Sequence, residues 1–169
     1  MTSSSEKSGN HSKIWLVTGD QGAGKTTLCQ AWIKLARGAG WTAAGVLSLG
    51  EFEGELKTAI QVEDLRTGER RLLASREAVD CQGPKLGSWQ FSEAALAWGD
   101  ERLREASPCD LLVVDELGPL EFERGEGWRS GFAAITDGVY RQALVVVRPE
   151  YLHVARQRWP EARVLRVFK

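Results

Sequence analysis

The stretch GDQGAGKTT at residues 19–27 matches the pattern G-x-x-x-x-G-K-[ST], and it directly follows the apolar run IWLVT at residues 14–18. A match of this kind between a strand and a helix is typical of a phosphate-binding loop. Glycines let the backbone point several N–H groups at one phosphate chain, and the helix that follows turns its positive end toward the same place. We therefore expect this stretch to hold the phosphates of a nucleotide.

Two side chains of the loop are expected to act on the phosphates directly. Lys25 can reach the β- and γ-phosphates as a point charge, and the Thr26 hydroxyl can coordinate the Mg²⁺ that bridges them. The residues predicted to bind the nucleotide are Gly19, Asp20, Gln21, Gly22, Ala23, Gly24, Lys25, Thr26 and Thr27.

Strand and helix patterns alternate on both sides of this loop. Residues 13–18 predict a buried strand, 25–39 an amphipathic helix and 42–49 a second strand, which completes a β-α-β unit. Such a unit predicts a parallel sheet with a right-handed crossover. Further buried strands are expected at 111–114 and 142–147. The predicted fold class is therefore α/β, a three-layer, Rossmann-like P-loop fold with a mostly parallel sheet.

Residues 57–74 depart from this alternation. Apolar and polar residues alternate over 57–65, the pair at 67–68 (Thr-Gly) marks a turn, and 70–74 resumes an apolar run. We interpret the segment as an antiparallel β-hairpin added to the parallel sheet. The acidic stretch EFEGE at 51–55 is either a solvated loop or a wall of the nucleotide site.

Two carboxylates follow the apolar run LLVV at 111–114. Because the carboxyl ends of parallel strands meet at one edge of a sheet, we expect Asp115 beside the phosphate loop, where it can hold Mg²⁺ through water. Glu116 stands where many NTPases of this architecture keep the base that orients and deprotonates the attacking water. Taken alone, an Asp-Glu pair is more often a solvated turn, but the complete phosphate loop upstream favours the catalytic interpretation.

Arg148 directly follows the strand expected at 142–147. An arginine at the carboxyl end of a parallel strand points to the ligand edge, so Arg148 is our candidate for stabilising charge on the transferred phosphoryl group; a solvated arginine is the alternative. Arg124 and Arg129 are expected near the same edge, and the sequence leaves each of them open between a contact to the γ-phosphate and a solvated side chain. From the sequence alone, Glu121 is a loop carboxylate before Phe122.

Seven tryptophans are many for 169 residues. Most fall at apolar positions of predicted elements and are expected in the core. Trp41 and Trp89 are candidates for stacking on a base. Stacking contacts the flat face of the ring, which all bases share, and so does not distinguish one base from another.

Charge and composition bear on possible binding partners and on cellular location. With 22 basic and 23 acidic residues the formal net charge is −1, so no global attraction to nucleic acid or to an anionic membrane is expected. The three cysteines are widely spaced and lack a C-x-x-C pair, which fits a reducing cytosol. Residues 1–12 are polar, with no signal-peptide pattern. We expect a disordered tail at 1–12, a single domain at 13–169 and a cytoplasmic location.

The octapeptide DELGPLEF at 115–122 is similar to the D-E-[hydrophobic]-G-x-[hydrophobic]-E signature of a small P-loop nucleoside-triphosphatase family, first described in thermophiles and related to a human cancer-associated NTPase. The loop extended through Leu28 and the segment at 64–69 also resemble that family. The resemblance covers most of 13–169. It implies Mg²⁺-dependent hydrolysis of ATP, GTP and other nucleoside triphosphates to diphosphate and phosphate. The resemblance also implies that Glu121 is a site acid, the alternative to a loop carboxylate.

The chain departs from this family around the predicted hairpin. Family members carry a glutamate and an arginine after the second strand and a Gly-Phe pair in the hairpin. Here the corresponding places hold Glu51, Glu53 and Lys57, then Ala59 and Ile60. Hairpin residues are therefore not carried over as site residues.

Two other function classes use the same loop. A small-molecule kinase would transfer the phosphoryl group to an acceptor under an arginine-rich lid, which the stretch 66–76 imitates. A nucleotide-binding switch or assembly factor would need a protein partner for turnover, and the sequence does not identify one.

Overall fold

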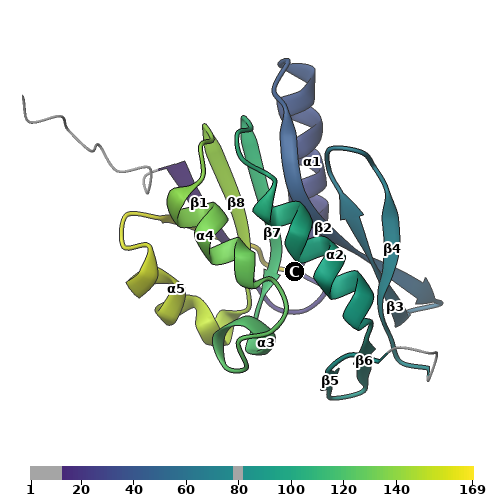
Figure 1. Ribbon diagram of the computed structural model, residues 1–169. Helices are drawn as coiled ribbons and strands as arrows, with labels where there is room; N and C mark the ends of the chain where they lie inside the picture. Colours follow the sequence, from purple (N-terminus) through teal and green to yellow (C-terminus); the bar gives the residue numbers. More distant parts are fainter. Residues whose placement is uncertain (1–12, 78–81) are drawn as a thin grey trace, which may run out of the picture.

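Parallel strands carry the phosphate loop and the acidic pair to one edge of a sheet. The computed structural model describes residues 13–77 and 82–169; the predicted tail at 1–12 and Cys81 lie outside the described residues. In the described chain, nine strands form one sheet in the order β5-β6-β4-β3-β2-β7-β8-β1-β9 (Figure 1). The parallel strands are β1 (Ile14–Thr18), β2 (Ala43–Glu53), β7 (Leu111–Leu117), β8 (Gln142–Val147) and β9 (Arg163–Arg166).

The other side of the sheet is antiparallel and extends from β2. It consists of β3 (Leu56–Asp64), β4 (Arg70–Ser75), β5 (Lys85–Leu86) and β6 (Trp89–Phe91). The predicted α/β fold class is confirmed, and the predicted hairpin is the β3–β4 pair within this larger antiparallel extension. The acidic stretch at 51–55 was predicted as a solvated loop or a wall of the nucleotide site. Residues 51–53 are not a loop, because they continue β2 and pair with β3, and Phe52 and Glu55 of this stretch line the cleft described below.

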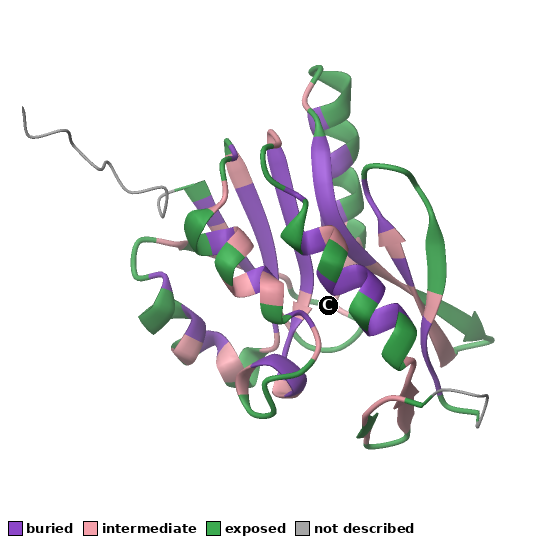
Figure 2. Ribbon diagram, viewed as in Figure 1, coloured by how far each residue is buried: buried purple, intermediate pink, exposed green. Residues whose placement is uncertain are grey.

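Helices cover both faces, which makes three layers. Helix α1 (Lys25–Gly38) packs on one face, where Cys29, Ile33 and Ala36 meet alternate residues of the parallel strands such as Val113 and Val146. The opposite face is covered by the helices α2 (Glu93–Arg104), α4 (Arg129–Asp137) and α5 (Leu152–Arg158). The remaining helical segments are α3 (Pro119–Phe122) and the 3₁₀ turn η2 (Pro149–Tyr151). Figure 2 shows the central strands buried between these layers.

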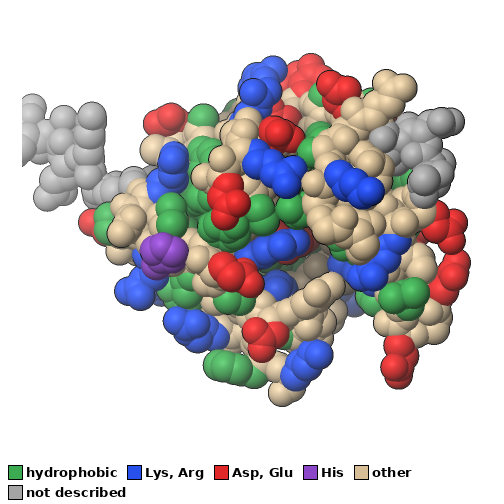
Figure 3. Space-filling view, turned by 90° about the horizontal axis from the view of Figure 1, so that it is seen from below, with side chains coloured by type: hydrophobic (Ala, Val, Ile, Leu, Met, Phe, Trp, Pro, Cys, Tyr) green, Lys and Arg blue, Asp and Glu red, His purple; other side chains and the backbone are tan. Residues whose placement is uncertain are grey.

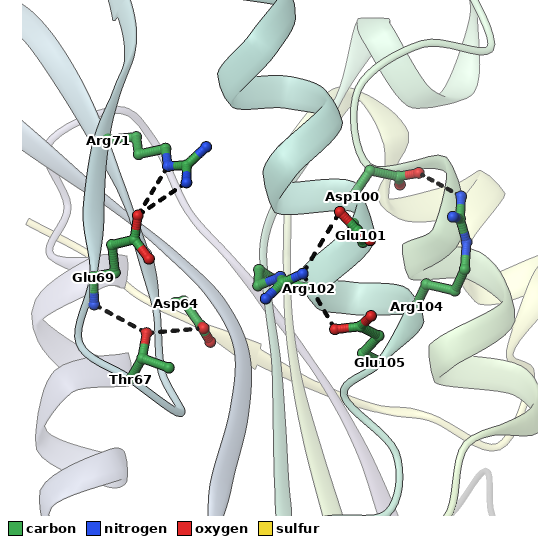
Figure 4. Close-up of polar contacts among 9 residues, drawn as sticks. All are labelled: Asp64, Thr67, Glu69, Arg71, Asp100, Glu101, Arg102, Arg104 and Glu105. Atoms are coloured by element: carbon green, nitrogen blue, oxygen red, sulfur yellow. Dashed lines mark hydrogen bonds and ion pairs between the residues drawn. The ribbon is translucent and has the colours of Figure 1, made fainter.

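A polar turn joins β3 to β4 where the sequence predicts one. The Asp64 carboxylate accepts hydrogen bonds from the Arg66 amide at 3.0 Å and from the Thr67 hydroxyl at 3.0 Å. The Glu69 amide donates to the Thr67 hydroxyl oxygen at 3.2 Å (Figure 4). Gly68, at φ 75°, takes the left-handed conformation that other residues disfavour. These contacts explain why the hairpin turns here.

Helices α2 and α4 lock together through a glycine and an aspartate. A Cβ on Gly99 would lie 2.5 Å from the ring of buried Trp128, so only glycine admits this close approach. The next residue, Asp100, accepts hydrogen bonds from the Ser130 amide at 2.7 Å and the Ser130 hydroxyl at 2.8 Å. Figure 4 shows the largely exposed Arg104 side chain beside the same carboxylate, with 3.6 Å between the charged atoms. The pair of helices therefore sets the position of Trp128, which contacts the site described below.

No helix within residues 13–77 and 82–169 is both long enough and apolar enough to cross a membrane.

Replacing Gly99 by Ala should lower the free energy of unfolding by about 1–3 kcal/mol, because the new methyl group displaces a buried ring. This loss should exceed the gain of about 1 kcal/mol in helix propensity. Gly38→Ala is the matched control, since a Cβ there meets nothing within 4 Å. Urea denaturation of both variants measures the difference, and equal stability of the two would contradict the packing described.

Asp110→Asn should destabilise the protein at neutral pH and lose that effect in acid. The Thr42 amide donates to the Asp110 carboxylate at 2.8 Å, and Arg141 lies 3.2 Å away. The hydrogen bond from Thr42 and the charge of Arg141 lower the pKa of Asp110 below its ordinary value of 3.8. A lowered pKa contributes stability above that value, and the contribution disappears as the pH falls through the lower folded-state pKa.

Thermal melts from pH 7 down to pH 2 should therefore show the variant and the wild type converging in acid. The exposed Glu161, replaced by Gln, serves as the control. A gap that stays constant with pH would rule out the ionised carboxylate as its cause.

Candidate active site

A cleft of about 990 Å³ opens at the carboxyl ends of the parallel strands. It is lined by nearly all of the residues predicted for the site: Gly19, Asp20, Gln21, Gly22, Gly24, Lys25, Thr26, Thr27, Asp115, Glu116 and Arg148. Ala23 is not part of the lining; its amide donates to the Asp20 carbonyl at 3.1 Å and closes the turn of the loop. Figure 3 looks at this edge of the sheet and shows basic side chains around a hollow.

The conformation of the loop depends on glycine at three positions. Gly22 and Gly24 have φ values of 77° and 99°, in the left-handed region. Gly19 is needed for a different reason, since a Cβ there would lie 2.3 Å from the Val167 carbonyl oxygen. Helix α1 begins at Lys25, and the backbone amides of its first turn have no partners within the helix. The loop and the helix together therefore present N–H groups to an anion.

Two lysines lie at the loop. The Lys25 ammonium donates to the Gly19 carbonyl and, at 3.3 Å, to the Asp20 carbonyl. Lys169 comes from the far end of the sequence: a Cβ on Gly22 would lie 3.7 Å from its Nζ atom. Lys169 was not predicted as a site residue, because no local sequence pattern links it to the loop.

Asp115 is a buried carboxylate at the end of β7, only 2% exposed. One carboxylate oxygen accepts a hydrogen bond from the Ser48 amide at 3.0 Å, and its backbone carbonyl accepts one from the Trp128 indole at 2.8 Å. Burial, with the neighbouring charge of Glu116, raises the pKa of Asp115 to about 7, although the Ser48 amide and the charges of two lysines oppose the shift. No basic side chain of the described residues forms an ion pair with it. Asp115 is thus suited to a cation that the chain itself does not supply.

Glu116 reaches the cleft because of an irregularity in β7. The pairing with β8 shifts register between Asp115 and Leu117, so Glu116 is the extra residue of a bulge, a feature that redirects a side chain. Its carboxylate forms an ion pair with the Arg148 guanidinium, with 3.0 Å between Oε1 and Nε. Arg148 lies against Gly118, where a Cβ would be 3.2 Å from its Cδ atom. The two predicted side chains therefore face each other, both partly exposed to the cleft.

Glu121 holds the backbone around the acidic pair. Its carboxylate accepts hydrogen bonds from the Gly118 amide at 2.9 Å and the Trp128 amide at 3.0 Å. Burial raises the pKa of Glu121 to about 7, while these hydrogen bonds act in the opposite direction. The carboxylate also borders the cleft, but both of its oxygens are engaged by backbone amides. We therefore assign it a positioning role.

Of the remaining predicted candidates, two tryptophans and two arginines, only Trp89 lines the cleft. Trp89 lines the cleft, whereas Trp41 lines a different, apolar groove on α1. Arg124 donates to the Lys85 carbonyl at 3.1 Å. Among the described residues, neither Arg124 nor Arg129 belongs to the cleft lining.

The chain is a P-loop α/β protein, because a glycine loop joins β1 to α1 and the carboxylates at the end of β7 lie in the same cleft. A family model described as NTPase matches residues 14–150, and the chain belongs to this family.

Relatives and solved structures agree with this assignment. The chain is similar to the nucleoside-triphosphatase THEP1 of Ignicoccus hospitalis, with 32% identity over 107 residues. This match covers 63% of the chain and 60% of the relative, so the chain matches well under two thirds of that protein's length. The THEP1 of Methanosarcina barkeri is 34% identical over 63% of the chain and 61% of its own length.

Two solved structures share the fold. The crystal structure of THEP1 from the hyperthermophile Aquifex aeolicus has a TM-score of 0.64 and 21% identity, covering 92% of this chain and 90% of that one. The solution structure of a human cancer-related nucleoside triphosphatase has a TM-score of 0.68 and 20% identity, covering 92% and 88%.

Glu121→Gln should destabilise the protein by about 1–3 kcal/mol, because the amide nitrogen would face one of the two backbone donors and leave it unsatisfied. Glu126→Gln, at an exposed position of the next loop, is the control. Chemical denaturation measures both. An unchanged midpoint for Glu121→Gln would mean that its hydrogen bonds do not hold the backbone.

Proposed function

We propose that this protein hydrolyses nucleoside triphosphates, ATP and GTP among them, to the diphosphate and phosphate with the help of Mg²⁺. The observation that carries the proposal is the position of Glu116, which shares one cleft with the phosphate loop and is held by Arg148. Membership of the NTPase family and similarity to nucleoside-triphosphatases named THEP1 support the same reaction.

The phosphate loop would bind the triphosphate. Its amides and the positive end of α1 favour an anion, and Lys25 now donates to two carbonyls that a phosphate oxygen would replace. Lys169 would add a second positive charge beside Gly22. Because these groups contact phosphate rather than base, the loop by itself favours no particular nucleotide, which agrees with a broad base preference.

One residue of the loop, Thr26, and one opposite it, Asp115, fit a magnesium ion. Mg²⁺ is usually held by one or two carboxylates, substrate phosphates and water rather than by a protein cage. The described residues contain no cluster of three or more potential ligands, but they place the buried Asp115 and the Thr26 hydroxyl in the same cleft. Asp115 and Thr26 would hold the ion, which when bound supplies positive charge to the β- and γ-phosphates.

Glu116 would prepare the attacking water. Its carboxylate accepts a proton from the water as the water oxygen bonds to the γ-phosphorus, and the bond from that phosphorus to the bridging oxygen breaks. The electron pair of the broken bond leaves with the diphosphate. Arg148, at 3.0 Å from Glu116, orients the carboxylate and lies where it can stabilise charge on the transferred group.

Replacing Glu116 by Gln should lower kcat at least about 100-fold while nucleotide affinity stays near that of the wild type, because an amide cannot take the proton. Phosphate release from ATP, GTP, CTP and UTP with Mg²⁺ measures turnover, and titration calorimetry measures binding. Undiminished hydrolysis by the variant would contradict the assignment of Glu116 as the base that activates water. Tight binding without turnover by the wild type would instead favour a kinase or a partner-dependent switch.

Lys25→Ala should weaken binding of Mg·ATP about 10- to 100-fold, the loss expected for one charge-assisted hydrogen bond to phosphate. Lys34→Ala, on the exposed side of the same helix, is the control. Equal affinities of the two variants would argue that the phosphates bind elsewhere.

A further inference from the structure

The cleft continues well beyond the phosphate loop, onto the antiparallel side of the sheet. The strand that carries Glu116, β7, is separated from the strand that carries Trp89, β6, by β2, β3 and β4. At about 4.8 Å between neighbouring strands, these four intervals correspond to about 19 Å along the sheet. The phosphate loop follows β1, which lies on the other side of β7. Glu116 therefore stands between two parts of one cleft.

We call the part over β3, β4 and β6 the distal chamber. Its lining includes Ile60, Leu73, Trp89, Phe91, Lys57 and Arg76. Trp89 and Phe91 are two residues apart on β6, so both side chains lie on one face of the strand. The chamber is thus largely apolar and aromatic, unlike the phosphate loop.

Two cations border this apolar surface. The Arg76 guanidinium lies over the Trp89 ring, 4.8 Å from its centroid. The Lys57 side chain passes over Gly50, where a Cβ would lie 2.6 Å from its Cε atom. Among the acids within the described parts of the chain, none forms an ion pair with either cation. Aromatic rings beside two cations that have no ion-pair partner in 13–77 and 82–169 suit a flat molecule with a negative group.

The distal chamber also lies on the side from which a nucleophile would approach the γ-phosphate. In-line displacement requires the nucleophile to approach the γ-phosphorus from the side opposite the β-phosphate. The phosphate loop would hold the β-phosphate on the β1 side of Glu116, so the nucleophile enters from the side of β2 and β3. A molecule in the distal chamber would reach the γ-phosphate from that direction.

We propose that the distal chamber is a second small-molecule site, which binds a planar organic anion on the nucleophile side of the γ-phosphate. The ring packs against Trp89 and Phe91, and the negative group pairs with Lys57 and Arg76. Its placement relative to the γ-phosphate rests on the proposed function, whereas the existence of the site does not. Such an occupant stands in the path of water and is held independently of the nucleotide.

Anilinonaphthalene sulfonate, which combines fused aromatic rings with one sulfonate, is the probe. Titrated by fluorescence into the full-length protein loaded with Mg²⁺ and a non-hydrolysable ATP analogue, it should bind in the nucleotide complex. Displacement of the probe by the analogue would overturn the proposal, because the chamber would then belong to the nucleotide.

Substitutions locate the bound probe. Trp89→Leu and Lys57→Met should each weaken its binding at least about tenfold, which is a readily measured change in dissociation constant. Trp41→Leu is the matched control, because Arg141 lies over Trp41 at 5.2 Å in the same way but outside the cleft. Lys34→Met controls for the loss of a lysine. Unchanged binding in both chamber variants, or loss in the Trp41 variant, would contradict the proposal.

Steady-state kinetics of phosphate release distinguish a failure of the second site from a failure of the proposed NTP hydrolysis. In the wild type, the probe should lower kcat for phosphate release and leave the KM for ATP unchanged, and competition with ATP would again place it in the nucleotide site. If the wild type releases no phosphate at all, the proposed function fails, while the binding measurements still decide whether the second site exists.

Discussion

A carboxylate buried at the end of β7 is the constraint around which the site is built. Asp115 is almost fully enclosed, and a charge in such a place is costly unless a partner compensates it. The Ser48 amide donates a hydrogen bond to the carboxylate, and the Trp128 indole donates to the backbone carbonyl of the same residue. Among the described residues, no basic side chain forms an ion pair with Asp115. Even the packing of α2 on α4 serves this position, since Gly99 admits the ring of Trp128. A buried carboxylate without a paired cation costs stability, and under the proposed function Mg²⁺ would compensate its charge.

The mixed sheet explains why one cleft has two kinds of wall. Parallel strands bring the loop after β1, the acids of β7 and Arg148 after β8 to one edge. The antiparallel strands that continue from β2 carry aromatic and basic side chains instead. Glu116 lies where these two surfaces meet, so it can serve a nucleophile that arrives from the antiparallel side. The fold thus joins the glycine loop and a surface of aromatic and basic side chains in one cleft.

Local sequence patterns predicted the parts of the site that depend on residues close together in the sequence. The loop, the acidic pair and Arg148 follow from a motif and from the rule that parallel strands end at one edge, and the structure places all of them in one cleft. Ser48 and Lys169 were missed because their roles depend on contacts between distant segments. The continuation of β2 through 51–53 was also missed: these residues, two glutamates flanking Phe52, are exposed and pair with β3 beyond the core, where no apolar alternation is required. Glu121 could be found from the sequence but not interpreted, since only the fold reveals its two backbone donors.

The buried carboxylate is tested most directly by thermal unfolding of Asp115→Asn and of the wild type at pH 8, each free, with ATP analogue alone, and with analogue plus Mg²⁺. We expect the free variant to be at least as stable as the wild type, because it lacks an uncompensated buried charge, and to lose the additional stabilisation that Mg²⁺ gives the nucleotide complex. A free variant that melts well below the wild type yet keeps the full effect of Mg²⁺ would show that Asp115 is structural and does not hold the metal.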